Sequence, residues 1–219
     1  MDTLAGTKGD MEGKIGVIAS HLDPVGRHGR HRLAKRRDVA TFAGAEEVET
    51  LSYAAACELK AIEATQQVVL GDGAEWIKTQ SGHHFPEAVK ILDWPHLRRK
   101  IQAAVRALQP GKHPVRRAWR KEQYRVLFPL LWEGAREQAL KHLSSLRPVS
   151  GEAPAAFEDA VRYLQTQQDW IGNYQAWREQ GYPVGSGLVE RAVAVVVNTR
   201  MKKRGMHWKR INADWDAAA

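Results

Sequence analysis

The sequence predicts an α/β fold in which a large all-helical insertion interrupts a smaller set of strands and helices. Three observations predict it. Short apolar runs rich in β-branched residues occur within the first 93 residues. A helical pattern then continues for about ninety residues without a strand-like segment. A final, strongly apolar helix follows, so the chain is expected to be one interrupted fold and not two domains in tandem.

The N-terminal part is predicted to begin with a β-hairpin followed by a helix. Lys14–Ser20 and Arg37–Ala43 are short strand-like segments, and the residues from Asp23 to Arg32 between them are typical of a turn. From Ala45 to Ala64, apolar residues recur every three or four positions, as in an amphipathic helix.

Two continuous apolar runs come next, Gln66–Gly71 and Ala88–Leu92, and each is predicted to be a buried strand. Everything after the second run is helical in pattern. The expected helices cover residues 95–108, residues 114–146 with a break or kink at Pro129, residues 154–180 with a division near Gly172, and a last helix from Ser186. The predicted boundaries are 1–96 for the first part of the core, 97–182 for the insertion, 183–210 for the final core helix and basic tail, and 211–219 for a short tail.

Charge and composition limit the function classes. The net charge of +8 favours an anionic partner, of which nucleic acid is the commonest, although a solvated basic surface is the alternative. The single cysteine excludes an intramolecular disulfide and a cysteine-based zinc site. Neither a signal peptide nor a run of 18 apolar residues is present, so we expect a cytoplasmic protein with no membrane partner. Most of the eight tryptophans are expected to be core or interface anchors.

Three acidic residues stand out by their positions. Asp72 and Asp93 each close an apolar run, where a carboxylate is costly unless it is solvated, paired or metal-bound. Glu190 lies near the start of the apolar final helix, after a Gly-Ser-Gly entry. A helix cap or turn is the alternative role for each aspartate, and a solvent-exposed first-turn position is the alternative for Glu190. Acids brought together from distant positions would suit two Mg²⁺ ions that promote an in-line phosphoryl displacement.

The segments "GDGAEWI", "ILDWPHLRRKI" and "YPVGSGLVERAVAVVVNTRMKKRGMHWKR", in this order, resemble the catalytic region of bacterial insertion-sequence transposases of the ISKra type. These are relatives of the mutator-like DDE transposases. The resemblance covers nearly the whole chain, from about Met1 to Arg210. It implies a ribonuclease-H-like mixed sheet, interrupted by the helical insertion before the last catalytic helix. It also implies cleavage of DNA at the ends of the element and transfer of the freed strands to target DNA.

Site residues follow from the same resemblance. Asp2, Asp72 and Glu190 match the catalytic acids, which would bind two Mg²⁺ or Mn²⁺ ions. Asp93 and His96 match an accessory Asp-x-x-His pair with a structural or substrate-orienting role, although a locally satisfied helix-start histidine is the alternative for His96.

The beginning of the chain departs from the family pattern. The half-strand that should carry Asp2 is missing, as is the N-terminal DNA-binding region usual in this family, so a truncated copy is expected. A metal ligand as close to the chain terminus as Asp2 is poorly held. Asp10 and Glu12 could replace it as the first ligand, but they are poorer candidates.

Two basic clusters are predicted to contact DNA phosphates, which would supply salt-dependent affinity without sequence information. The predicted DNA-binding residues are Arg27, Arg30, Arg32, Lys35, Arg36 and Arg37 in the first cluster, and Arg191, Arg200, Lys202, Lys203, Arg204, Lys209 and Arg210 in the second. A solvated hairpin tip is the alternative for the first cluster. "RRAWR" and "RKEQYR" in the insertion suit either additional DNA contacts or a solvated helix face.

The sequence therefore leaves three functions open. The leading one is a DDE transposase core that acts on transposon ends and target DNA and self-associates on paired ends. The second is a truncated remnant that binds DNA without catalysis. The third is a stand-alone nuclease such as a resolvase, which shares the metals but not the strand joining.

Overall fold

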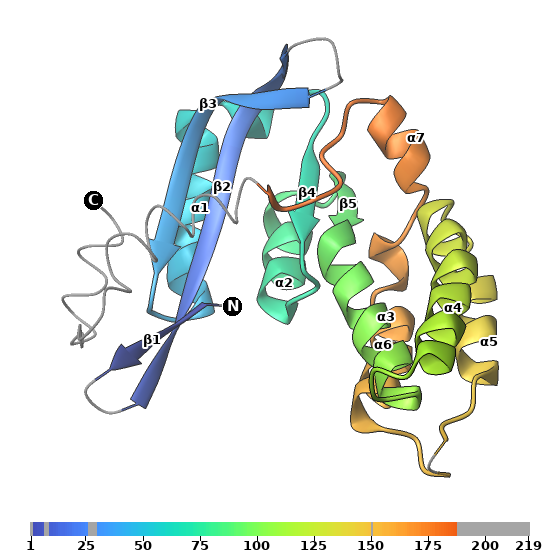
Figure 1. The fold of residues 1–219 in the computed structure, drawn as a ribbon. Helices are drawn as coiled ribbons and strands as arrows, with labels where there is room; N and C mark the ends of the chain where they lie inside the picture. Colours follow the sequence, from blue (N-terminus) through green and yellow to red (C-terminus); the bar gives the residue numbers. More distant parts are fainter. Residues whose placement is uncertain (1, 7–8, 26–29, 150, 188–219) are drawn as a thin grey trace. The chain divides into compact units, whose positions relative to one another are not determined.

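The computed structural model describes residues 2–6, 9–25, 30–149 and 151–187, with side chains for 13–20, 35–149 and 151–187. Among these residues the chain forms two compact units (Figure 1). The first comprises residues 2–67 and 78–88 with Gly187, and the second comprises Val68–Ile77 and Val89–Ser186. The mixed α/β class predicted from the sequence is confirmed.

The first unit is built on an antiparallel sheet with the strand order β1-β2-β3. Helix α1 lies along β2 and β3 (Figure 1), and its residues Val48, Ala55 and Ala56 are buried. The predicted hairpin is confirmed, because β2 pairs with β3 in a register that sets Ile15 opposite Ala40. The elements of this unit are β1 (Asp2–Gly6), β2 (Gly9–Val25), β3 (Arg30–Thr41), α1 (Ala45–Glu58), the 3₁₀ helix η1 (Ala61–Glu63) and most of α2 (Glu75–His84).

The hairpin strands are longer than the sequence pattern predicted. Asp23–Val25 and Arg30–Arg32 belong to β2 and β3, although the sequence placed them in a turn. Main-chain pairing between the strands therefore overrides the turn preference of these residues. The pairing skips Ser20 and Lys35, and Lys35 has a φ of 45°, which few residues with a side chain adopt.

The second unit combines a two-stranded parallel sheet with a bundle of helices (Figure 1). Both predicted strands and the helical segment that follows them are confirmed. The elements are β4 (Val68–Gly71), β5 (Val89–Leu92), α3 (Trp94–Leu108), α4 (Pro114–Trp132), α5 (Arg136–Ser145), α6 (Ala155–Thr166), the 3₁₀ helix η2 (Gln168–Trp170) and α7 (Tyr174–Glu179).

Helix α3 shows how the core of this unit forms. Its apolar residues recur at helical spacing, and Leu97, Ile101, Val105 and Leu108 are at most 1% exposed. They pack against β5 and the other helices of the unit. The expected role of the tryptophans is also confirmed, since Trp94, Trp119, Trp132, Trp170 and Trp177 all belong to this core or pack against it.

Two local features differ from the sequence expectation. Of the break or kink expected at Pro129, the break does not occur, because α4 continues through it to Trp132. Proline removes one N–H donor, and its would-be acceptor belongs to Arg125, an exposed residue whose carbonyl can bind water instead. The break comes after Trp132, where Gly134 has a φ of 81°. The sequence also gave no sign of α2, which fills much of the segment between β4 and β5.

No helix in the part of the chain that the structure describes is both long and apolar enough to cross a membrane.

Candidate functional site

Asp72 and Asp93 emerge at the same edge of the parallel sheet. Gly71 and Leu92 are register partners at the carboxyl ends of β4 and β5, and each aspartate is the next residue. The Asp93 N–H donates to the Gly71 carbonyl at 2.7 Å, which extends the pairing by one bond. Crevices beyond the carboxyl ends of parallel strands are common ligand sites, so this edge is the candidate functional site.

Asp93 is committed to holding three segments together. The residue is 1% exposed, and both carboxylate oxygens accept backbone hydrogen bonds. Oδ2 accepts from the His96 N–H at 3.1 Å, which caps α3, and Oδ1 accepts from the Ser186 N–H at 2.7 Å. The neighbouring Trp94 N–H donates to the Val184 carbonyl at 3.0 Å. Asp93 is therefore a buried clamp between the end of β5, the start of α3 and residues 184–186.

The close docking of this segment explains one of the two glycines noted in the sequence. A Cβ on Gly185 would lie 3.2 Å from Cδ of Pro95, so the small residue allows the 184–186 segment to approach the first turn of α3. Gly187 has no atom within 4 Å of a built Cβ among the described residues.

Asp72 is placed differently, because its carboxylate is only half-buried. Its Oδ1 accepts the Ala74 N–H at 3.0 Å, and Ala74 is the one donor that reaches this carboxylate within the described residues. The side chain thus forms a local turn and keeps its second oxygen for a ligand. Of the two strand-end aspartates, Asp72 is the one that can still bind a cation or a proton donor.

Helix α6 and the residue after it hold the backbone of this turn. The Tyr163 hydroxyl donates to the Asp72 carbonyl at 2.6 Å, and Nε2 of Gln167 donates to the Gly73 carbonyl at 3.0 Å. Gly73 has a φ of 88°, and a Cβ there would lie 2.7 Å from Cδ of Gln167. Because these contacts come from more than 90 residues along the chain, the insertion itself positions Asp72.

His96 interacts electrostatically with both strand-end aspartates and with two neighbouring cations. Burial lowers the pKa of His96 below 6.5, Asp72 and Asp93 oppose this shift, and Arg99 and Lys100 add to it. His96 is therefore a neutral imidazole at pH 7, and it interacts electrostatically with both aspartates. Burial, followed by the charge of Asp72, raises the pKa of Tyr163, so its hydroxyl stays protonated and keeps donating.

The shifted pKa of His96 predicts a pH effect on stability. The unfolded chain binds a proton at His96 below pH 6.5 more readily than the folded chain does. This group's contribution to stability is thus fully present above pH 6.5 and is lost as the pH falls toward the lower folded pKa. We expect the urea midpoint of wild type to fall more steeply between pH 7.5 and 5.5 than that of His96→Gln. Identical slopes for the two proteins would contradict the assignment.

Of the three predicted catalytic acids, the structure describes the side chain of Asp72 alone. Asp2 lies on β1 opposite Gly13, in the first unit, and its side chain is outside the described residues. Glu190 also lies outside them. Within the described part of the chain, no group of three or more His, Cys, Asp or Glu residues could hold a metal ion. The three-acid site therefore stays a prediction.

The predicted DNA-binding clusters are described only in part. Arg36 pairs with Asp38 at 2.6 Å and Arg37 pairs with Glu58 at 3.2 Å, so both already have a carboxylate partner in the first unit. Lys35 is exposed. Arg30 and Arg32 lie at the beginning of β3, and their side chains are outside the described residues. The rest, which also lie outside them, are Arg27, Arg191, Arg200, Lys202, Lys203, Arg204, Lys209 and Arg210.

Sequence reasoning missed the residues of α6 that hold the Asp72 turn. Tyr163 and Gln167 are four residues apart, so their side chains lie on the same side of the helix. Leu164, the residue after Tyr163, is fully buried. Two polar residues at this spacing beside a buried leucine were the available signal. Their partners, however, could not be read from the sequence.

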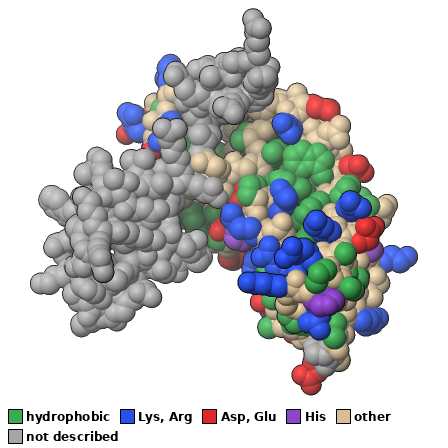
Figure 2. Space-filling model, in the orientation of Figure 1, with side chains coloured by type: hydrophobic (Ala, Val, Ile, Leu, Met, Phe, Trp, Pro, Cys, Tyr) green, Lys and Arg blue, Asp and Glu red, His purple; other side chains and the backbone are tan. Residues whose placement is uncertain are grey.

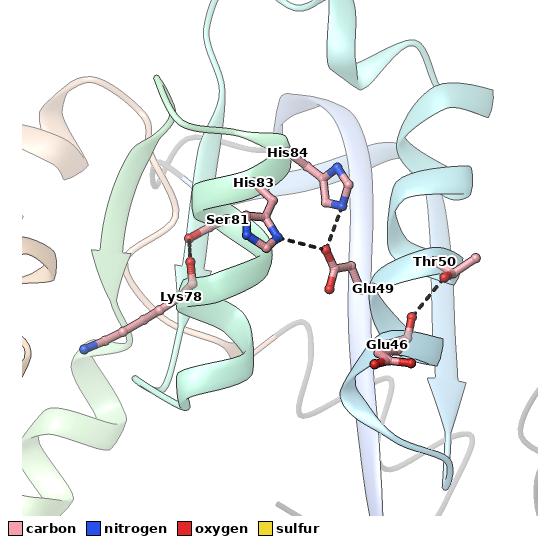
Figure 3. Close-up of polar contacts among 7 residues, drawn as sticks. All are labelled: Glu46, Glu49, Thr50, Lys78, Ser81, His83 and His84. Carbon is pink, nitrogen blue, oxygen red and sulfur yellow. Dashed lines mark hydrogen bonds and ion pairs between the residues drawn. The ribbon is translucent and has the colours of Figure 1, made fainter.

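A second polar cluster, in the first unit, was also missed (Figure 3). Oε1 of Glu49 lies 2.9 Å from Nε2 of His84 and 3.5 Å from Nδ1 of His83, which joins α1 to α2. The Tyr53 ring stacks on His84 with a centroid separation of 4.4 Å. The two imidazoles share a single carboxylate oxygen, an arrangement that fits a bridge between helices.

No protein-family model, curated protein or solved structure matches the chain.

Proposed function

We propose that this chain is the catalytic core of a DDE-type DNA transposase with a ribonuclease-H-like fold. The observation that carries the proposal is the half-buried Asp72 carboxylate, which lies at the carboxyl end of a parallel strand and has one oxygen without a donor among the described residues. The family resemblance of the motifs around Asp72, Asp93 and Glu190 and the net charge of +8 support it.

The donor chemistry at this site partly fits the Mg²⁺ or Mn²⁺ ions that such an enzyme uses. A carboxylate oxygen is the ligand that these hard cations prefer, so Asp72 fits. Asp93 does not fit, because both of its oxygens accept backbone N–H groups. In the proposal Asp2 and Glu190 supply the other ligands. Two such ions would activate the attacking oxygen and stabilise the leaving oxygen at a DNA phosphodiester.

The chain's own residues would then have distinct roles. Asp72 provides the carboxylate, and Tyr163 and Gln167 keep its turn in place through the main chain. Arg99 and Lys100, whose charges act on neighbouring His96, supply positive charge for a bound phosphate. Neutral His96 can accept a proton or orient substrate through its ring. Asp93 keeps residues 184–186 docked at the point from which the chain leads to Glu190.

The decisive experiment compares Asp72→Asn with wild type in metal-dependent nicking of supercoiled DNA. Asparagine can still accept the Ala74 N–H, so the turn is kept and only the charge is removed. We expect the nicking rate to fall by at least about 100-fold. Mutation of residues that only support a metal ligand already lowers metal affinity or activity by about 10- to 100-fold, and Asp72 is proposed to be a ligand itself. Asp169→Asn removes an exposed carboxylate from the same unit and should nick as wild type does. Equal nicking by Asp72→Asn and wild type would overturn the proposal.

A strand-transfer assay with pre-cut ends separates the transposase from a nuclease, because only the transposase joins a 3′ hydroxyl to target DNA. Measurement of the protein's mass on paired ends tests the proposed self-association.

A DNA-binding remnant without catalysis is the second candidate. One observation supports it, namely that the span from α3 to α4 carries ten Lys and Arg residues and one Glu, a positive charge that does not depend on the acidic residues of the site. DNA binding without metal-dependent nicking by the wild-type chain would identify this second function.

A further inference from the structure

The helical hairpin formed by α3 and α4 carries a large surplus of positive charge. From Trp94 to Trp132, which spans α3, α4 and their loop, there are ten Lys and Arg residues and one Glu, a surplus of nine. The whole chain has a net charge of +8, so all other residues together sum to −1. Helix α1, by contrast, has four Glu and no Lys or Arg. Charge is therefore segregated between elements and not mixed evenly over the surface.

Helix α4 presents part of this charge in a regular row. Arg117, Lys121 and Arg125 follow one another at intervals of four residues, and all three are exposed. Neighbours at this spacing lie on the same side of a helix. The row extends for about 12 Å along the helix axis, a length over which duplex DNA carries several phosphate charges.

The row is not neutralised by neighbouring acids. Among the described residues, no carboxylate pairs with Arg117 or Lys121, and Arg125 has one loose contact with Glu122 at 3.6 Å. Like charges four residues apart repel one another, and α4 contains three such pairs: Arg116 with Arg120, Arg117 with Lys121, and Lys121 with Arg125. An ordinary solvated helix face alternates its charges, whereas this one has a repulsion that a bound polyanion would relieve.

The loop before α4 is held firmly beside the row. Nη1 of Arg116 donates to the Pro110 carbonyl at 2.6 Å, and Nη1 of Arg120 donates to the carbonyls of Gln109 at 2.5 Å and Gly111 at 3.0 Å. These bonds fix the turn that carries exposed Lys112. Lys and Arg side chains gather on the face of the helical unit seen in Figure 2.

We infer that the exposed face of α4 formed by Arg117, Lys121 and Arg125 is a binding surface for the phosphate backbone of duplex DNA. The inference goes beyond the proposed function and does not depend on it, because none of the catalytic acids takes part. It also adds a surface to the two basic clusters in the hairpin and the tail. Contacts of this kind supply affinity and salt dependence but no sequence preference.

The test measures binding of the full chain to a short labelled duplex of arbitrary sequence over a series of salt concentrations. The variant Arg117→Gln/Lys121→Gln/Arg125→Gln should reduce the slope of log affinity against log salt by about 2.7, or about 0.9 for each lost phosphate contact. At moderate salt its affinity should fall by at least about tenfold.

A matched control removes the same charge from other helices of the same unit. Lys141→Gln/Arg162→Gln/Arg178→Gln changes three exposed residues on α5, α6 and α7, and like the test variant it removes one arginine that contacts a nearby acid. This control should keep the wild-type slope. Equal weakening by the two triple variants would show that net charge alone acts and would overturn the inference, as would a test variant that binds like wild type.

Two further measurements identify the partner and the type of contact. Arg117→Lys/Arg125→Lys keeps the charges, so it should keep the slope, and a loss comparable to that of the glutamine variant would rule out simple phosphate contacts. Binding of the wild type to anionic lipid vesicles through this row, with duplex binding unchanged in the glutamine variant, would also overturn the assignment. Nicking by Asp72→Asn is scored separately, so each proposal can fail alone.

Discussion

Replacement of Asp93 by alanine is expected to lower the free energy of unfolding by about 3–6 kcal/mol, because a hydrogen bond to a charged group contributes about 1.5–3 kcal/mol and two are lost. Both N–H groups, of His96 and Ser186, would be left in an interior that admits almost no water, since Asp93 itself is 1% exposed.

Asp93→Asn separates this role from one based on charge alone. Both partners of the carboxylate are donors, and an asparagine side chain has only one acceptor oxygen. Its amide nitrogen would meet a second N–H donor, so the variant should be destabilised by about 2–3 kcal/mol despite its nearly identical shape. Asp72→Asn is the matched control and should cost less than about 1 kcal/mol, because its one accepted bond is retained.

Urea unfolding measures these changes, and limited proteolysis adds a local readout. Loss of the Asp93 clamp should make residues 182–187 accessible to protease before the rest of the second unit unfolds. Two hydrogen bonds dock this segment, one from the Ser186 N–H to Asp93 and one from the Trp94 N–H to the Val184 carbonyl. An Asp93→Asn protein with the stability and protease resistance of wild type would disprove the clamp.

Replacement of Gly73 by alanine is the second large effect, with an expected loss of about 2–4 kcal/mol. A residue with a side chain is strained by about 1–2 kcal/mol at a φ of 88°. The new Cβ would also lie 2.7 Å from Cδ of Gln167, and overpacking of this kind costs about 1–3 kcal/mol. The side chain of Gln167 cannot move away freely, because the residue is 5% exposed and is bonded to Gly73.

A double-mutant cycle isolates the steric part of this loss. Gln167→Ala removes the obstructing side chain, so Gly73→Ala should cost at least about 1 kcal/mol less in that background than in wild type. Gly82→Ala is the control, since nothing lies within 4 Å of its built Cβ and it sits inside α2, where alanine should stabilise by about 0.5–1 kcal/mol. Additive effects of Gly73→Ala and Gln167→Ala would show that the two residues do not touch.

The Gly73→Ala variant also tests the proposed function. Gly73 follows Asp72 directly, so a distorted turn displaces the carboxylate that would hold the metal. We expect Gly73→Ala to lose metal-dependent nicking at temperatures where the protein is still folded, and Gly82→Ala to keep it. Nicking by folded Gly73→Ala at the wild-type rate would remove Asp72 from the reaction.

Local patterns in the sequence were sufficient for most of the elements. The β-branched runs ending at Gly71 and Leu92 and the helical spacing of Leu97, Ile101 and Val105 depend on neighbours a few residues away, and the structure follows them. Pro129 was misleading because its effect depends on whether the carbonyl it leaves unpaired can reach water. Helix α2 escaped prediction because polar residues dominate its length.

Local sequence patterns were enough to place two aspartates at the ends of two apolar strands and to show that the chain has a positive net charge. Which of the two aspartates keeps an oxygen for a ligand depends on tertiary contacts. Asp93 and Asp72 have the same local context, a carboxylate after a short apolar run, but the segment around Ser186 supplies Asp93 with a second N–H donor, whereas α6 reaches only the backbone at Asp72. Hydrogen-bond partners more than 90 residues away are set by packing, which no local pattern encodes.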